Sequence, residues 1–359
     1  MSKRKFIKAI LMQYSGIVGA GIFILPYLFF YSNFHFVTLW LIILALFAMA
    51  LDQLYIDIII NTKGDHQLAG YARIYLGKPF EILATANMLI LGLGATSAFI
   101  RLGSDFIKLL LPGSPSIVYQ LIFLAFLGIF HASNFKIVKK ISHYIPLLSV
   151  IIILILFAAS LNIPFSTLEF PPPNYAFFGG LIFAITGFVI IPEIERYING
   201  NKNKLCNKRR GRRWIIWASR CGTGLAAMTY IIFAIAIILL SGHHLSADTL
   251  TGLLATHPHF GAIIAVLGIV LTFKACLNFV VGLQQMFFHD YNLSENKSLL
   301  ISLLVPFSTL FLANFSFMQI ISITGTFTIA ISAFIIVCVK LSQWRIKLKK
   351  SRKNSILSM

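Results

Sequence analysis

Charged residues are scarce in this sequence. Asp, Glu, Lys and Arg make up 11% of it, against about 25% in soluble globular domains. Apolar residues make up 58%, and no polar region between the apolar runs is long enough to fold by itself. This composition excludes a soluble protein, and we expect one integral membrane domain embedded in a lipid bilayer.

Acidic residues are especially few: 11 stand against 30 Lys and Arg, so the formal net charge is +19. In a soluble protein that excess would suggest nucleic acid. Here the basic residues lie in short connections between apolar runs, where they orient a membrane protein in the bilayer. We therefore expect no nucleic-acid partner.

Cysteine motifs and catalytic groupings are also missing. The four cysteines, Cys206, Cys221, Cys276 and Cys338, have neither CxxC nor metal-binding spacing. The apolar runs contain no constellation of nucleophile and base. We expect no disulfide framework, no metal site, no cofactor and no enzyme activity.

Long apolar runs, by contrast, fill the chain from end to end. A spanning helix needs about 20 largely apolar residues. The first run contains Gly and Pro, exceeds signal-peptide length and lacks a small-x-small cleavage site, so we expect a retained helix. This all-α pattern predicts ten spans, near residues 6–30, 37–60, 80–110, 117–132, 143–161, 175–198, 214–241, 260–288, 298–313 and 318–341.

Basic residues alternate between the connections. They gather in the N-terminus, in every second connection and in the tail: Lys3, Arg4, Lys5 and Lys8; Lys63, Arg73 and Lys78; Lys136, Lys139 and Lys140; the run from Arg196 to Arg220; and the residues after Lys340. The connections near 31–36, 111–116, 162–174, 242–259 and 314–317 contain no Lys or Arg. The positive-inside rule therefore puts both termini in the cytoplasm.

Two spans five apart contain helix-breaking residues at corresponding places. Residues 16–27 read GIVGAGIFILPY, and residues 183–193 read FAITGFVIIPE. Glycines can simply allow helices to pack closely. Interrupted helices at corresponding places in two halves, however, are typical of an inverted-repeat transporter whose binding site lies between them.

Such interruptions suit a zwitterion. A half-helix that begins near Gly21 directs free amide groups and a positive dipole end into the gap, which favours a carboxylate. Unpaired carbonyls near Ile17, Val18, Phe183 and Ala184 suit an ammonium group. An α-amino acid carries both groups on one carbon, although another small organic solute stays open.

These segments resemble a known family. GIVGAGIFILPY, FAITGFVIIPEIERY (183–197) and TKGDHQLAGYARIYLG (62–77) are similar to the first helix, the sixth helix and the second-to-third connection of amino acid permeases of the APC superfamily. They look most like the amino acid/auxin permease branch, which includes bacterial tryptophan and tyrosine permeases. The resemblance implies a secondary active transporter of neutral or aromatic amino acids in the bacterial inner membrane, working by alternating access.

The resemblance also implies the architecture and the site. Two inverted five-helix repeats, 1–161 and 162–341, would precede a basic cytoplasmic tail, 342–359, and the first and sixth helices would be broken around a central substrate. The implied substrate-binding residues are Gly19, Ala20, Gly21, Ile22, Ile185, Thr186, Gly187 and Phe188. The backbone of the first three would bind the carboxylate, and Phe188 would gate the site or contact the substrate side chain.

Lys274 is the ionisable residue whose charge would be most costly to bury in the membrane, because it lies about 20 Å into a span of roughly 40 Å by helix rise. In the resembling families the eighth helix often supplies a Thr-Ser pair to a sodium ion, and those two positions are Ala275 and Cys276 here. Lys274 therefore either replaces sodium and exchanges a proton, or pairs permanently with a carboxylate.

Three acidic residues in the spans have less central positions. Glu193 is either a proton carrier or the structural partner of a basic loop residue. Asp57 is expected at the cytoplasmic interface, with Asp52 about a turn and a half deeper.

Two rival functions follow from the same fold. A non-transporting amino acid sensor could signal through the basic loop 199–213, and this alternative stays open. The Asp-Pro-Gly and Met-Pro-His patterns of metal-ion transporters are missing from the first and sixth spans, so we expect no metal substrate.

Overall fold

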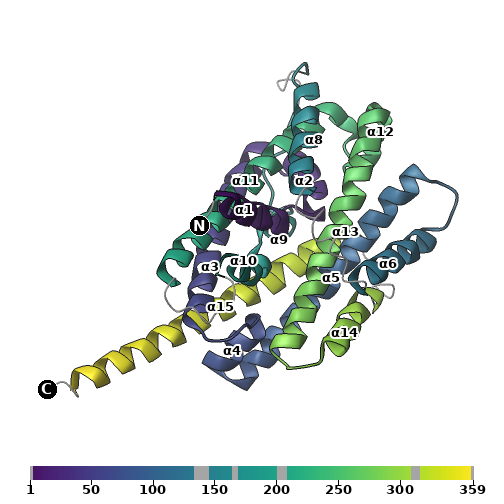
Figure 1. Ribbon diagram of the computed structural model, residues 1–359. Helices are drawn as coiled ribbons and strands as arrows, with labels where there is room; N and C mark the ends of the chain where they lie inside the picture. The colour runs from purple at the N-terminus through teal and green to yellow at the C-terminus, as the bar shows by residue number, and fades with distance from the viewer. Residues whose placement is uncertain (1–2, 133–144, 164–168, 200–207, 309–315, 357–359) are drawn as a thin grey trace.

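A computed structural model of the protein describes residues 3–132, 145–163, 169–199, 208–308 and 316–356 (Figure 1), and all regular structure in these ranges is helical. The predicted basic group Lys136, Lys139 and Lys140, Cys206 and most of the loop 199–213 lie outside them. The helices of the first half are α1 (Lys3–Ile17), η1 (Ala20–Ile24), α2 (Leu25–Tyr31), α3 (Phe34–Asn61), α4 (Leu68–Leu76), α5 (Lys78–Leu110), α6 (Ser116–Ala132) and α8 (Ile145–Ser160).

The second half repeats this order of long and interrupted helices. Its elements are α9 (Phe178–Ile185), η3 (Phe188–Ile190), α10 (Ile191–Asn199), α11 (Lys208–Ser241), η5 (Gly242–His244), α12 (Leu250–Thr256), α13 (Pro258–His289), α14 (Glu295–Ser308) and α15 (Phe317–Ile356). The short helices α4 and α12 occupy stretches that the sequence left as connections.

Six helical segments of the described chain are long and apolar enough to cross a membrane, and a seventh is added when the bent pair α1 and η1–α2 is counted as one span. The helices α6 and α8 are apolar but shorter, and α14 stops at Ser308, where the described range ends. Each of the ten predicted spans thus has a helix at its place, although length and apolarity identify at most seven as candidate spans.

The last helix is longer than predicted. The sequence placed the end of the tenth span near residue 341, but α15 continues to Ile356, and its C-terminal part projects beyond the other helices (Figure 1). The residues after 341 contain neither Gly nor Pro, and Leu, Lys, Arg and Gln favour helix. The described part of the basic tail is therefore a helical extension of the last span.

Apolar side chains cover the outside of the bundle. Along α3, Leu39, Ile42, Leu46 and Phe47 are exposed at helical spacing, while Asp52 on the same helix is buried. A protein in water would place these groups the other way round. This distribution is what a lipid-facing surface requires.

Polar contacts tie the helix ends together at the end of the bundle that the sequence places in the cytoplasm. Asp57 on α3 accepts from Arg212 Nε on α11 at 2.6 Å and lies 3.2 Å from Lys340 Nζ on α15. The Asp290 carboxylate, just after α13, accepts from the amides of Gln67 at 3.0 Å and Gly70 at 2.9 Å. These contacts fix α4 against α13 and join the first half of the chain to the second.

Candidate functional site

The first span is interrupted within the segment that the sequence predicted. Helix α1 ends at Ile17, Val18 and Gly19 are not helical, and a 3-10 turn runs from Ala20 to Ile24 before α2 begins. The axis bends by 52° at this interruption. Pro26 is the second residue of α2, where its missing amide hydrogen costs no helical bond.

The sixth span is interrupted in the same way. Helix α9 ends at Ile185, Thr186 and Gly187 are not helical, and the 3-10 turn η3 leads into α10. The Thr186 hydroxyl donates to the Ile182 carbonyl at 2.5 Å and so caps the end of its own helix. Of the four predicted site residues here, Thr186 is half-buried, while Ile185, Gly187 and Phe188 are buried.

The two interruptions face each other through reciprocal contacts. A Cβ atom placed on Gly21 would lie 3.2 Å from the backbone of Ala184, near the end of α9. A Cβ atom on Gly187 would overlap the side chain of Ile17, the last residue of α1. Neither glycine has a positive φ, so close approach rather than backbone conformation is what requires glycine at these positions.

Tyr230 on α11 joins the two interruptions, and the sequence analysis missed it. Its fully buried hydroxyl lies 2.9 Å from the carbonyl of Ile17 and 2.8 Å from the carbonyl of Ala184. These are two of the carbonyls that the sequence left unpaired. A hydroxyl has one proton, so it donates to one of them at a time, and each carbonyl keeps accepting capacity.

The amide groups at the start of η1, the first turn of the half-helix formed by η1 and α2, point back along the chain, whereas the carbonyls at the end of α1 point forward. A helix leaves the amides of its first turn without helical partners. Ile22 N donates to Gly19 O at 3.3 Å, whereas the amides of Ala20 and Gly21 have no acceptor in the described part of the chain. Free donors and partly used acceptors therefore lie within one pair of interruptions.

Aromatic side chains close the region around the interruptions. Phe183 lies 3.9 Å from the Cβ position of Gly21, and the ring of Phe99 on α5 lies about equally far from Phe183 (6.0 Å) and Phe279 on α13 (5.9 Å). Phe188, predicted to gate the site or contact the substrate side chain, packs edge-on against Tyr55 of α3, with the two ring centroids 6.3 Å apart. The aromatic ring next to Gly21 is therefore Phe183.

Lys274 reaches the first span next to its interruption. This buried lysine on α13 donates from Nζ to the Ser15 hydroxyl on α1, and a Cβ atom on Gly19 would lie 2.9 Å from Cβ of the adjacent Ala275. No carboxylate within the described ranges lies within 4 Å of its ammonium group. The alternative of a permanent carboxylate partner therefore finds no support among these residues.

Glu193, in the first turn of α10, belongs to a separate polar network. Gln285 on α13 donates to Glu193 Oε1 at 3.0 Å and accepts from Arg196 at 2.6 Å and from Gln67 at 3.0 Å. Gln285 is eleven residues beyond Lys274 on one helix, roughly 16 Å by helix rise. The structure thus does not bring the two predicted coupling residues together.

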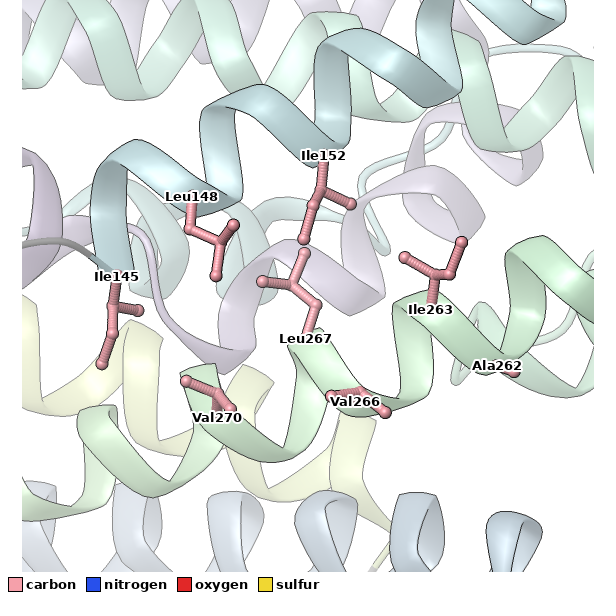
Figure 2. Close-up of a pocket in the computed structure, with 8 residues that line it drawn as sticks. All are labelled: Ile145, Leu148, Ile152, Ala262, Ile263, Val266, Leu267 and Val270. Atoms are coloured by element: carbon pink, nitrogen blue, oxygen red, sulfur yellow. The ribbon is translucent and has the colours of Figure 1, made fainter.

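A groove between α8 and α13 has a different character. It has a volume of about 370 Å³, and Figure 2 shows apolar side chains from both helices lining it: Ile145, Leu148, Ile152, Ala262, Ile263, Val266, Leu267 and Val270. No polar group in this lining could bind a carboxylate or an ammonium group. The groove is therefore not a candidate site for a zwitterion.

Comparisons with known proteins identify the fold. No protein-family model matches the chain, and no curated protein matches its sequence. The inward-facing conformation of Mhp1 matches with a TM-score of 0.66 and 11% identity, over 93% of this chain and 75% of that one. MhsT in complex with L-phenylalanine matches with a TM-score of 0.59 and 16% identity, over 94% and 88%.

A manganese transporter of Eremococcus coleocola also matches, with a TM-score of 0.59 and 13% identity, over 94% of this chain and 75% of that one. Mhp1 is a nucleobase-cation-symport-1 family transporter. Identities this low show the fold alone. The chain has the fold of multi-pass membrane transporters, and the matched proteins are not enzymes.

Replacing Gly21 by Val tests the close approach of the two interruptions. The new side chain would press on the backbone of Ala184, so we expect the half-helices to separate and substrate binding and uptake to fall at least about tenfold. Gly128→Val on α6 is the matched control, because a Cβ atom there meets nothing within 4 Å. Both variants should elute as folded protein, and unchanged uptake by Gly21→Val would contradict this geometry.

Replacing Tyr230 by Phe removes one oxygen from between the two interruptions. Leaving buried carbonyls unpaired costs about 1 to 3 kcal/mol, so we expect a lower melting temperature in detergent and weaker substrate binding. Tyr14→Phe is the control, since Tyr14 is equally buried and its hydroxyl lies 3.4 Å from Ser149. Equal effects of the two substitutions on binding would show that Tyr230 has no special role.

Proposed function

We propose that the protein is a secondary active transporter of neutral or aromatic amino acids that works by alternating access. The proposal rests on the pair of interrupted helices in a transporter fold. Where the two interruptions contact each other, they present free amide donors and carbonyl acceptors. Non-helical backbone at membrane depth is tolerated where it is buried in protein or lines a cavity. A binding site between the two spans explains why both contain non-helical backbone.

The two ends of an α-amino acid fit the two sides of this pair. The substrate carboxylate binds the amides of Gly19, Ala20 and Gly21, beside Ile22, at the positive end of the second half-helix. The ammonium group binds the carbonyls of Ile17 and Ala184 together with the Tyr230 hydroxyl, which can accept a bond as it donates one.

The substrate side chain occupies the opposite side of the site. Ile185, Thr186, Gly187 and Phe188 line it, and the rings of Phe183, Phe99 and Phe279 supply apolar contacts. These contacts favour a neutral or aromatic side chain, because a charged one would lose its hydration without a partner.

The reciprocal contacts of the interruptions also support the architecture. Gly21 meets Ala184 near the end of α9, while Gly187 meets Ile17 at the end of α1, so each interruption packs against the helix end of the other half. We place ten spans in two inverted repeats, 1–161 and 162–341, with the basic tail 342–359. Both termini lie in the cytoplasm of a bacterial inner membrane, and the amino acid/auxin permease branch is the family that the sequence resembles.

Lys274 supports coupling to protons rather than to sodium. Its ammonium lies beside Ser15 near the interruption of the first span, where Ala275 and Cys276 offer no hydroxyls to a sodium ion. Loss and gain of a proton at this buried lysine would couple the gradient to movement of α1. Glu193 is proposed as a second coupling residue at the cytoplasmic end, through Gln285 and Arg196.

One other substrate class is favoured by a specific observation. Mhp1 has been solved with bromovinylhydantoin bound, so the fold also accepts a small organic solute that is not a zwitterion. A metal ion fits poorly, because the free amides of Ala20 and Gly21 would repel a cation. Within the described ranges no three His, Cys, Asp or Glu side chains are grouped to hold one.

Uptake into proteoliposomes tests the function. We expect accumulation of one or more labelled neutral or aromatic amino acids when the outside is acidic, and no requirement for a sodium gradient. Unlabelled substrate should compete, and empty liposomes are the control. Binding of amino acids without any uptake would favour the sensor, and uptake of hydantoins alone would replace the proposed substrate class.

Lys274→Ala tests the coupling residue. We expect gradient-driven uptake to fall at least about tenfold while exchange of internal for external substrate survives, because the groups proposed to bind the carboxylate and the ammonium lie on other helices. Lys297→Ala on the exposed face of α14 is the control and should behave as the unsubstituted protein. Strict sodium dependence together with full uptake by Lys274→Ala would show that Lys274 is structural.

A further inference from the structure

A second buried ionisable group lies close to the interrupted helices. Asp52 on α3 is 1% exposed and accepts hydrogen bonds from Gln13 Nε2 on α1 at 2.8 Å and from Ser219 Oγ on α11 at 2.7 Å. Gln13 Nε2 also lies 3.4 Å from Thr223 Oγ1. We call Gln13, Asp52, Ser219 and Thr223 the Asp52 cluster.

The cluster contains no cation within the described ranges. Many charged side chains on Asp52's own helix and on the helices around it have other contacts: Asp57 with Arg212 and Lys340, Arg220 with Gln53, Lys347 with Asn61, Glu193 and Arg196 with Gln285, Glu195 with Asn199, and Lys5 and Lys8 with Tyr197. Lys3, Arg4, Arg213 and Arg345 on these helices are exposed. The nearby tyrosines are Tyr14 on α1 and Tyr55 on α3. A permanent negative charge at Asp52 would therefore be buried without compensation, which is costly.

One polar atom of the cluster has no partner. Gln13 is fully buried, and its Oε1 makes no hydrogen bond in the described structure. Both bonds to Asp52 end on the same oxygen, Oδ2. A turn of the Gln13 amide would bring Oε1 to the place of Nε2, 2.8 Å from Asp52 Oδ2, where it can accept a hydrogen bond from a proton on that oxygen. The cluster therefore offers hydrogen bonds to both protonation states of Asp52.

The cluster is joined to both interruptions. Gln13 is four residues, one helical turn, before Ile17, and its Nε2 lies 3.0 Å from the Cβ position of Gly187. A Cβ atom on Gly222 of α11 would lie 2.6 Å from Gln13 Cβ. Thr223 is two turns before Tyr230 on the same helix. A change in how Gln13 bonds to Asp52 would therefore move an atom that lies next to Gly187, where the two interruptions meet.

We propose that Asp52 is a proton-binding site that takes up a proton from water on one side of the membrane and releases it on the other during the transport cycle. Uptake converts the carboxylate to a carboxylic acid, and release restores it, with no other bond made or broken. The inference rests on the proposed function for its role in transport. The proton site itself can be measured without any substrate.

Infrared spectroscopy of the protein reconstituted in lipid tests the site directly. We expect a carbonyl band of a protonated carboxylic acid that disappears as the pH is raised and is missing from Asp52→Asn. Asp57→Asn is the matched control, because Asp57 is on the same helix but is paired with two cations; that variant should keep the band. A band that persists in Asp52→Asn, or one that never changes between pH 4 and 10 (roughly the range of carboxyl titration in proteins), overturns the proposal.

A milder variant keeps the test decisive if Asp52→Asn does not fold. Ser219→Ala removes one donor to the carboxylate and leaves the acid in place. Ser219 stabilises the carboxylate form, so we expect its loss to move the pH midpoint of the band upward by about one to two units, the strength of a hydrogen bond to a charged group. An unmoved midpoint contradicts the proposed site.

Transport assays then separate this inference from the proposed function. If the unsubstituted protein transports no amino acid but the Asp52 band titrates, the proposed function fails and the proton site stands. If amino acid uptake driven by a pH gradient is the same in Asp52→Asn and in the unsubstituted protein, the proton site has no role in coupling and the inference fails.

Discussion

The structure depends on one constraint: backbone polar groups at membrane depth must find partners within the protein. Two spans are interrupted near their middles, and Tyr230 brings a single hydroxyl to the carbonyl of Ile17, the last residue of α1, and to that of Ala184, the residue before the last of α9. The interruptions then pack on each other through Gly21, where a Cβ atom would lie 3.2 Å from Ala184, and Gly187, where it would overlap Ile17. Each interruption is thus stabilised by the other and by one residue of α11.

Helix α1 connects this centre to two buried ionisable groups. Within three residues, Gln13 bonds to Asp52 on α3 and Ser15 contacts Lys274 on α13. Both contacts lie within about a turn of Ile17, the helix end that meets Gly187. The two groups have opposite charge when ionised and lie on different helices. In the proposed mechanism, α1 is therefore the helix that contacts both proton-binding groups and the substrate.

The end of the bundle assigned to the cytoplasm is held by a different set of contacts. Gln285 joins α10 to the start of α4 through Arg196 and Gln67. The Asp290 carboxylate accepts hydrogen bonds from the backbone amides of Gln67 and Gly70 at the start of α4. Asp57 joins α3 to α11 and α15. These bonds link parts of the chain that must separate if that end is to open. Glu193 belongs to this network through its bond with Gln285.

Local patterns in the sequence determined the membrane class, the places of the ten helices and the two interruptions, because apolar length, Gly and Pro act on the backbone where they stand. The sequence also marked Lys274 as an ionisable residue deep in its span. Only the tertiary structure showed that the Tyr230 hydroxyl contacts both interruptions, that the ring of Phe183 lies beside Gly21, and that Asp52 has no cationic partner within the described ranges. These features depend on which faces of distant helices meet, and a buried tyrosine or aspartate carries the same local pattern whatever partner the fold brings to it.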